Sequence, residues 1–190
     1  MAHTHDKLKQ KVQGIAPLSA EDLNSFCEAA TPIECKKGHL LLKEGQVCKS
    51  IYFIESGYLR SYYMPDGLEI NTGLHFENSF VTNLKSLRME LPSDSYLIAA
   101  EPAVLYGFTK EKMMALYARC APVVEFGKKL LELLAIEQQE QISLFQLYSA
   151  EERFRYIQKT QPEIFQRVPL STLASYLGVA RETLSRFRKK

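Results

Sequence analysis

The sequence predicts an α+β protein: an antiparallel β-roll with flanking helices, a long helix, and a small helical C-terminal domain. Residues 32–108 contain short runs of branched and aromatic residues punctuated by glycines, which favours antiparallel strands. Residues 122–148 carry an apolar stripe at helical spacing. Residues 170–190 place apolar side chains on both sides of a glycine, as two short packed helices require.

The N-terminal part is polar up to residue 18, after which Ser19 and Asp22 resemble a capping box that opens a helix over 20–30. The expected strands have the sequence ranges 51–54, 58–63, 68–75, 96–100 and 104–108. Pro65-Asp66-Gly67 predicts a hairpin turn between the second and third of these runs. A further helix, capped by Thr109, is expected over about 110–119.

The long helix of residues 122–148 has an apolar stripe with two polar interruptions. Its members are Leu130, Leu134, Glu137, Gln141, Leu144 and Tyr148. This stripe either lies on the β-roll of its own chain or forms a two-fold coiled-coil contact, in which the polar residues set the register. Ser149 and Glu152 form a second capping box, so we predict domains at 1–149 and 150–190.

The C-terminal stretch predicts two helices joined at Gly178, where a backbone with positive φ favours glycine. Ser171 is a candidate cap for the first helix, and the second is expected over about 180–189. The apolar positions are Leu173, Leu177, Val179, Leu184 and Phe187. The opposite face of the second helix carries guanidinium, carboxylate and hydroxyl groups, which are suited to reading base edges in a major groove.

The motif Arg181-Glu182-Thr183-Leu184-Ser185-Arg186, preceded by Leu177-Gly178-Val179, resembles the recognition helix of the Crp/Fnr family of bacterial transcription regulators. The resemblance implies base contacts by Arg181, Glu182 and Arg186. The candidate DNA-binding residues are Arg181, Glu182, Thr183, Ser185, Arg186, Arg188 and Lys189, the last two mainly toward the DNA backbone. The chain stops directly after this helix, where family members often continue into a β-wing, so some phosphate contacts are expected to be missing.

The body of the chain also resembles that family. The residues Lys37-Gly38, Leu40, Glu44-Gly45, 51–54 and 57–60 follow the opening strands of a cyclic-nucleotide-binding domain, a jelly-roll-like β-roll, and the resemblance covers about residues 15–190. It implies a homodimer through the long helix, which favours the coiled-coil alternative for its stripe. The implied partners are double-stranded DNA with a pseudo-palindromic site, a second copy of the chain, and RNA polymerase.

A cyclic phosphate needs a paired positive charge, and a carboxylate suits a ribose hydroxyl. The resemblance implies that nucleotide-binding members of the family supply these groups with a Gly-Glu pair and, ten residues after that Glu, an Arg followed by Ser or Thr. These positions fall on Thr82-Asn83 and on Ser93-Asp94, so the glycine, the carboxylate and the guanidinium are all absent. The candidate effector pocket is therefore Thr82, Asn83, Lys85, Ser93 and Asp94, with cyclic nucleotides disfavoured and no other effector or cofactor assigned. Lys85 or Arg88 could replace the lost charge, although neither stands at the expected position.

Charge distribution, apolar runs and cysteine spacing limit the functions that the protein can have. Residues 151–190 hold nine Lys/Arg and four Asp/Glu, against 15 and 18 in the remainder, which fits a basic nucleic-acid head on an acidic body. Because the sequence shows neither a membrane-length apolar run nor a signal-peptide core, we expect a cytoplasmic protein. Four scattered cysteines, Cys27, Cys35, Cys48 and Cys120, predict reduced thiols rather than an iron–sulfur or metal site.

The sequence leaves three alternative functions. The leading hypothesis is a dimeric, sequence-specific transcription regulator that is not an enzyme. A signalling module that binds a partner protein and has lost DNA binding is the second. A cupin-type metalloenzyme is the third, and it is disfavoured because His39 and His75 are separated and each is expected to be an ordinary strand residue. We predict no metal site and no catalytic residues.

Overall fold

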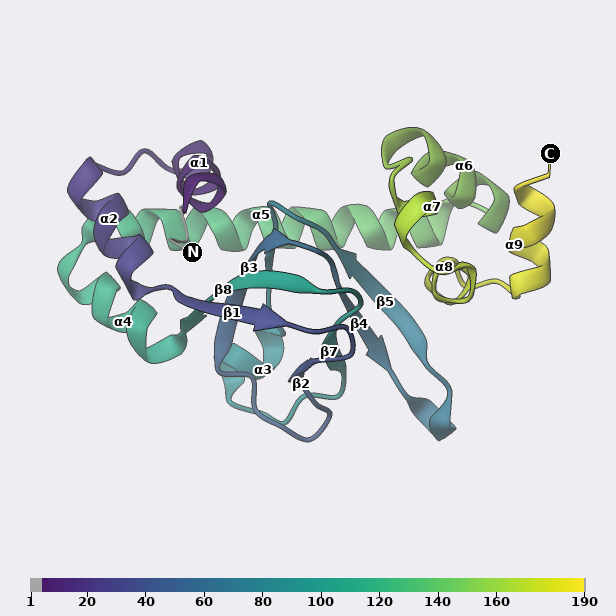
Figure 1. Ribbon diagram of the computed structural model, residues 1–190, viewed down its shortest axis with the longest axis horizontal. Helices are drawn as coiled ribbons and strands as arrows, with labels where there is room; N and C mark the ends of the chain where they lie inside the picture. The colour runs from purple at the N-terminus through teal and green to yellow at the C-terminus, as the bar shows by residue number, and fades with distance from the viewer. Residues whose placement is uncertain (1–4, 190) are drawn as a thin grey trace. The chain divides into compact units, whose positions relative to one another are not determined.

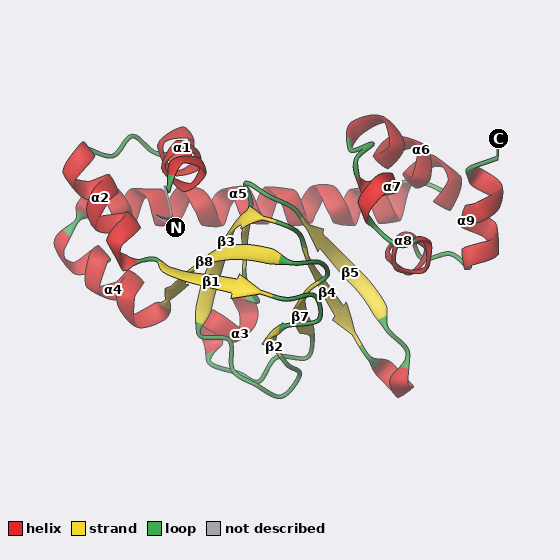
Figure 2. Ribbon diagram, in the orientation of Figure 1, coloured by secondary structure: helices red, strands yellow, loops and turns green. Residues whose placement is uncertain are grey.

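The computed structural model describes residues 5–189 and divides into two compact units. The first comprises residues up to 61 together with 74–132, and the second comprises 62–73 with 133 onward. Figure 1 labels the elements along the chain, and Figure 2 separates helices from strands.

The β-roll consists of two four-stranded sheets, with strand orders β1-β8-β3-β6 and β2-β7-β4-β5. The strands are β1 (Thr31–Cys35), β2 (Leu40–Leu42), β3 (Ser50–Ser56), β4 (Leu59–Tyr63), β5 (Ile70–His75), β6 (Phe80–Val81), β7 (Tyr96–Ala99) and β8 (Ala103–Thr109). The longest ladder is antiparallel and pairs β3 with β8, from Ser50 opposite Thr109 to Ser56 opposite Val104. The predicted antiparallel roll is therefore confirmed, and the predicted turn at Pro65–Gly67 is a single 3₁₀ turn between β4 and β5.

The core of the roll is aliphatic. Ile54, Leu59, Ala99 and Leu105 are fully buried between the two sheets. Burying a leucine or isoleucine stabilises a fold by about 1.5–3 kcal/mol, so this cluster is the main cohesive element of the roll. At Gly57, φ is +82° and a Cβ would lie 2.5 Å from the Pro102 carbonyl oxygen, so only glycine fits the bend between β3 and β4.

Helices surround the roll in the first unit. They are α1 (Asp6–Ile15), α2 (Ala20–Ala29), α3 (Leu84–Met89), α4 (Lys110–Arg119) and the N-terminal half of α5 (Ala121–Leu147). Ser19 accepts from the Asp22 amide and Thr109 from the Lys112 amide, so both predicted caps are confirmed. Helices α1 and α3 were not predicted from the sequence. Leu8, Val12 and Ile15 stand at helical spacing in α1, but the other residues of this helix are mostly polar and only Leu8 and Val12 are buried.

The second unit contains the rest of α5 followed by a group of short helices. They are α6 (Ala150–Thr160), α7 (Ile164–Arg167), α8 (Leu170–Leu177) and α9 (Arg181–Phe187). Ser149 and Glu152 form both hydrogen bonds of the predicted capping box at the start of α6. One prediction is wrong in detail: α8 begins directly after Pro169, which has no side-chain hydrogen bond to offer, so Ser171 lies inside the helix and does not cap it. The domain boundary at 149/150 stays a prediction.

Candidate functional site

The turn between α8 and α9 is closed by backbone geometry at Gly178. Its φ is +70°, and the Val179 amide donates to the Ala174 carbonyl oxygen at 3.0 Å, which is the hydrogen-bond pattern of a Schellman cap. An added Cβ would meet nothing closer than 3.9 Å. The glycine is therefore required by the backbone conformation and not by lack of space.

The two helices are locked together by side chains that the sequence pattern singled out. Leu173, Leu177 and Leu184 are completely buried, while Val179 and Phe187 are half-buried. The ring of Phe154 from α6 packs at 5.7 Å from that of Phe187. One side of α9 is thus anchored in the core of the second unit.

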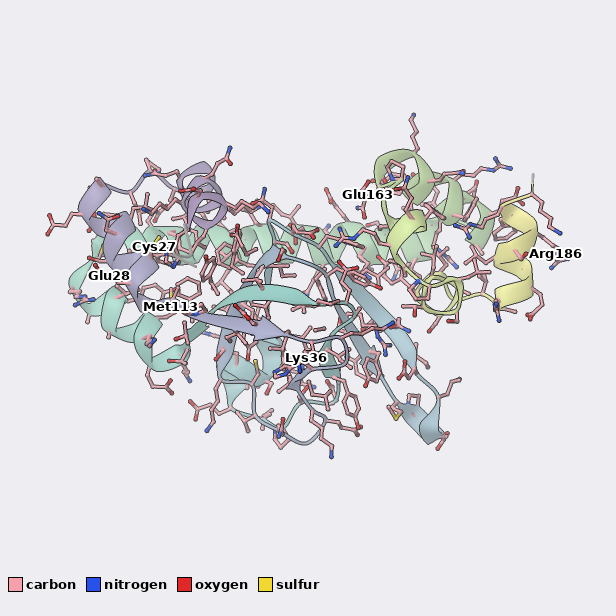
Figure 3. The ribbon with its side chains drawn as sticks, in the orientation of Figure 1. Cys27, Glu28, Lys36, Met113, Glu163 and Arg186 are labelled. Carbon is pink, nitrogen blue, oxygen red and sulfur yellow. The ribbon has the colours of Figure 1, made fainter. Side chains whose placement is uncertain are left out.

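The other side of α9 is open to solvent. Arg181, Glu182, Arg186, Arg188 and Lys189 are exposed, and Thr183 and Ser185 are half-buried. Figure 3 labels Arg186 on this helix. Its guanidinium donates to Thr183 Oγ1 at 3.2 Å, whereas Arg181, Glu182 and Lys189 make no side-chain hydrogen bond to any residue within 5–189.

Arg188 is less free than the sequence indicates. Its Nη2 donates to the Phe165 carbonyl oxygen at 2.9 Å, and the guanidinium carbon lies 5.8 Å from the centre of the Phe165 ring. Arg188 therefore ties the end of α9 to α7. A phosphate contact by this residue would have to compete with that internal hydrogen bond.

Arg153 on α6 is a residue that sequence reasoning missed. Its guanidinium donates to the carbonyl oxygens of Phe145 (3.3 Å), Tyr148 (2.8 Å) and Leu177 (3.0 Å). These carbonyls belong to the C-terminal ends of α5 and α8, where the helix leaves acceptors unpaired and the dipole favours a cation. An arginine near the start of an amphipathic helix gives no sequence signal of such a role.

The hairpin segment 69–72 also belongs to the second unit and contacts two of its helices. Ser175 Oγ on α8 donates to the Glu69 carbonyl oxygen and accepts from the Asn71 amide, both at 3.0 Å. Gln141 Nε2 on α5 donates to the Thr72 carbonyl oxygen at 2.7 Å. The hairpin thereby fixes the positions of α8 and the second half of α5.

The predicted effector-pocket residues lie together and bond mainly to one another. Asn83 caps α3 by accepting from the Ser86 amide, and its Nδ2 donates to the hydroxyls of Ser93 at 2.9 Å and Ser95 at 3.2 Å. Ser93 is only 3% exposed. The polar groups at the expected phosphate position therefore already satisfy each other.

The remaining members of this pocket are also engaged. Lys85 and Asp94 form a surface ion pair at 3.3 Å, and Thr82 Oγ1 donates to the Ser50 carbonyl oxygen at 2.9 Å. Because Asp94 cancels the charge of Lys85, this lysine does not leave a free cation for a phosphate.

The two body histidines and the four cysteines do not assemble into a metal site. No group of three or more His, Cys, Asp or Glu side chains suited to a metal ion occurs within residues 5–189. The four cysteines are buried free thiols. His75 lies in β5, where its Nε2 is 3.1 Å from Ser61 Oγ and burial lowers its pKa to about 4.

The predicted dimer stripe of α5 is largely occupied by the chain itself. Leu130 is only 7% exposed, Leu134 and Leu144 are half-buried, and Gln141 bonds to the hairpin; only Glu137 and Tyr148 are exposed. A different stripe with 3–4 spacing is more open, comprising Leu133, Ile136, Glu140, Ser143 and Leu147. Its three aliphatic members are 40%, 53% and 77% exposed, respectively.

No helix among the described residues is long and apolar enough to cross a membrane.

The β-roll matches a known domain model, and most of the chain resembles several solved structures. Residues 32–120 match the model of the cyclic nucleotide-binding domain. The chain resembles the catabolite activator protein of Thermus thermophilus, with 20% identity, a TM-score of 0.60, and coverage of 94% of this chain and 85% of that one. It also resembles the c-di-GMP-responsive global regulator CLP of Xanthomonas campestris, with 19% identity, a TM-score of 0.66 and coverage of 90% of both chains.

A third similar structure is a protein from Eubacterium rectale assigned to the Crp/Fnr family of transcriptional regulators. It is 20% identical, has a TM-score of 0.68, and the match covers 90% of this chain and 82% of that one. No curated protein shows a significant sequence match. Residues 32–120 therefore resemble a cyclic nucleotide-binding domain, and the chain has the fold of Crp/Fnr-type regulators, which confirms the resemblance inferred from its sequence.

Proposed function

We propose that the protein is a dimeric, sequence-specific DNA-binding regulator of the Crp/Fnr type, in which α8 and α9 form the helix-turn-helix. One observation carries the proposal: α9 is anchored by the fully buried Leu184 while Arg181, Glu182 and Arg186 project from its exposed face. An arginine fork matches guanine, and a carboxylate accepts from the cytosine amino group. The Crp/Fnr-type fold supports this assignment over an enzyme.

Dimerisation is the second part of the proposal. The open stripe of α5 repeats every three and four residues and carries Leu133, Ile136 and Leu147 with large exposed fractions. Such a seam buries its apolar surface by pairing with a copy of itself, and Glu140 and Ser143 would act as the polar positions that fix the register. A two-fold dimer would present two copies of α9 to a pseudo-palindromic site.

The third part concerns the effector. We infer that the roll does not hold cyclic nucleotides through the usual clamp, because Asn83 and Ser93 bond to each other and Asp94 pairs with Lys85. The protein is then a regulator whose signal is another small molecule or none. This role needs no cofactor and no catalytic residue.

Selection of bound sequences from random double-stranded DNA tests the proposal. The expected result is an enriched pseudo-palindrome whose half-sites lie one helical turn apart, roughly 34 Å. The matched control is Arg181→Ala combined with Arg186→Ala, which removes the base-reading fork and should abolish the enrichment. Failure of the unmodified protein to enrich any palindrome would favour the partner-binding signalling module instead.

A further inference from the structure

A cavity of about 100 Å³ lies in the first unit, outside the β-roll. Its walls come from β3, β6 and β8 of one sheet and from α2, α3, α4 and the first half of α5. Of the five predicted effector-pocket residues, only Thr82 lines it. The cavity is therefore a different place from the expected cyclic-nucleotide site.

The inner wall of the cavity is aromatic and rigid. Phe26, Phe80, Phe108 and Phe126 are all at most 4% exposed. Phe26 packs against Phe108 and Phe126 at ring distances of 4.7 and 5.0 Å, and Phe80 lies 5.8 Å from Phe126. Native cores leave few voids larger than a water molecule, and cavities lined by apolar side chains accept small apolar groups.

The cavity reaches the surface at a polar rim. Arg88 from α3 and Met114 from α4 both line the cavity and are exposed. The neighbouring Met113, which also lines the cavity, is labelled on α4 in Figure 3. Lys110 also lines the cavity but is paired with Glu90. Arg88, in contrast, has no hydrogen bond or ion pair with any residue in the described range 5–189.

Tyr117 adds a hydroxyl to this rim. Its Oη lies over the backbone of Gly127, where an added Cβ would be only 2.3 Å away, so the glycine on α5 makes room for it. The hydroxyl has no hydrogen-bond partner among the described residues. Burial raises the pKa of Tyr117, while the positive charge of Arg88 acts in the opposite direction; the tyrosine therefore remains a protonated donor at neutral pH.

We propose that this cavity binds a small amphipathic carboxylate, with its short apolar tail among the four phenylalanines and its carboxylate held by Arg88 and Tyr117. The guanidinium fork and the phenol supply donors only, and a carboxylate supplies acceptors only. The aromatic wall excludes a polar tail, because burying a polar group without partners is unfavourable. This site is independent of DNA binding and of the phosphate position of the roll.

Calorimetric titration of the full-length protein with octanoate tests the proposal, with 1-octanol as the uncharged probe of equal chain length. Octanoate should bind more tightly than octanol. Arg88→Met and Tyr117→Phe should each weaken octanoate about tenfold or more, the effect expected for losing a hydrogen bond to a charged group, and should leave octanol unchanged. Arg119→Met, which removes an exposed arginine outside the cavity, is the matched control and should change neither affinity.

A cavity-filling variant tests whether the apolar tail of the ligand occupies the cavity. Leu84→Trp replaces a half-buried lining residue with a larger one and should abolish binding of both probes. Circular dichroism checks that the variant is folded, and the two rim variants decide the outcome if it is not. The proposal is overturned if octanoate does not bind, if it binds no better than octanol, or if Arg88→Met and Arg119→Met have the same affinity for it.

Discussion

Asn83 donates a hydrogen bond from Nδ2 to the Oγ of Ser93 across 2.9 Å, and the two residues stand ten positions apart in the chain. They occupy the positions at which nucleotide-binding relatives are expected to carry a carboxylate and an arginine. A side-chain amide and a buried hydroxyl that satisfy each other have little to gain from a phosphate, and neither carries a charge to neutralise one. We therefore expect this pair to contribute nothing to the binding of a phosphate.

We predict that cyclic AMP and cyclic GMP bind with dissociation constants weaker than micromolar, as measured by calorimetry. Two variants act as controls for a substitute charge: Lys85→Met breaks the ion pair with Asp94, and Arg88→Met removes the exposed guanidinium of α3. Micromolar binding by the unmodified protein that either variant abolishes would show that this lysine or arginine has replaced the usual clamp.

Arg153 should be the most important single charge of the second unit for stability. Arg153→Ala leaves three carbonyl oxygens at the ends of α5 and α8 without their donor, and each unsatisfied buried group costs about 1–3 kcal/mol. We expect a loss of about 2–4 kcal/mol in the free energy of unfolding, since water will reach some of these oxygens.

Arg155→Ala is the matched control on the same helix. Arg155 makes one exposed ion pair with Glu151, four residues earlier, and such pairs contribute about 0.3–0.5 kcal/mol. Urea denaturation of both variants measures the difference. Equal losses for the two variants would mean that the carbonyl contacts of Arg153 contribute no more than a surface ion pair.

Dimerisation should depend on the open stripe of α5. Ile136→Glu places a charge at a position that is 53% exposed in the single chain and should convert a dimer into a monomer, because an unpaired charge is unfavourable in an apolar seam. Gln138→Glu adds the same charge on the opposite side of the helix and should leave the dimer intact. Light scattering gives the mass of each, and a monomer for the unmodified protein at micromolar concentration would contradict the prediction.

Helical periodicity alone does not identify which face of α5 is buried. Both the stripe from Leu130 to Tyr148 and the stripe from Leu133 to Leu147 repeat at three and four residues. Only tertiary structure distinguishes them: Leu130 is buried in its own chain and Gln141 bonds to the hairpin, whereas Leu133 and Ile136 remain open. A pattern can identify an amphipathic helix but not what covers each of its faces.

The sequence predicts a local feature well where a single residue determines it. Gly178, Thr109 and Ser149 each have a backbone or capping role that their chemistry requires, and the structure places each in that role. The contacts of Arg153 and the cavity beside Arg88 depend on elements far apart in the sequence. No spacing rule connects such residues, so they become visible only in the folded chain.

Acidification should destabilise the protein through His75. Burial lowers its folded-state pKa from 6.5 to about 4, so between these values the unfolded chain takes up a proton that the folded chain does not. The contribution of His75 to the free energy of unfolding is therefore complete above pH 6.5 and is lost as the pH falls toward 4. Because the side chain of His75 is only half-buried, we expect this loss to be about 1–3 kcal/mol.

His75→Gln removes this titration and keeps a side chain able to bond with Ser61. The free energy of unfolding of the variant should depend less on pH than that of the unmodified protein between pH 6.5 and 4. His39→Gln, at a histidine in an exposed position, is the matched control. If the two variants show the same pH dependence, the burial of His75 does not affect stability.

The exposed residues of α9 should differ in what they contribute to DNA binding, because their side-chain chemistry differs. Arg186 can present a planar fork to a guanine, so Arg186→Ala should cost about 1–3 kcal/mol on the best site and relax specificity at one position of each half-site. Lys189 is exposed two residues after the helix ends at Phe187 and presents a point charge. Lys189→Ala should weaken all sequences alike and make the salt dependence shallower by about one unit.

Arg188 provides an internal comparison, because its guanidinium is already bonded to the Phe165 carbonyl oxygen. If that bond persists on DNA, Arg188→Ala should change the salt slope less than Lys189→Ala does, although both remove one positive charge from the same end of the chain. Titrations of the selected site and of a scrambled site at several salt concentrations separate these effects. A uniform loss of affinity for Arg186→Ala across both sites would show that Arg186 contacts only the DNA backbone, because a residue that reads a base must discriminate between the two sequences.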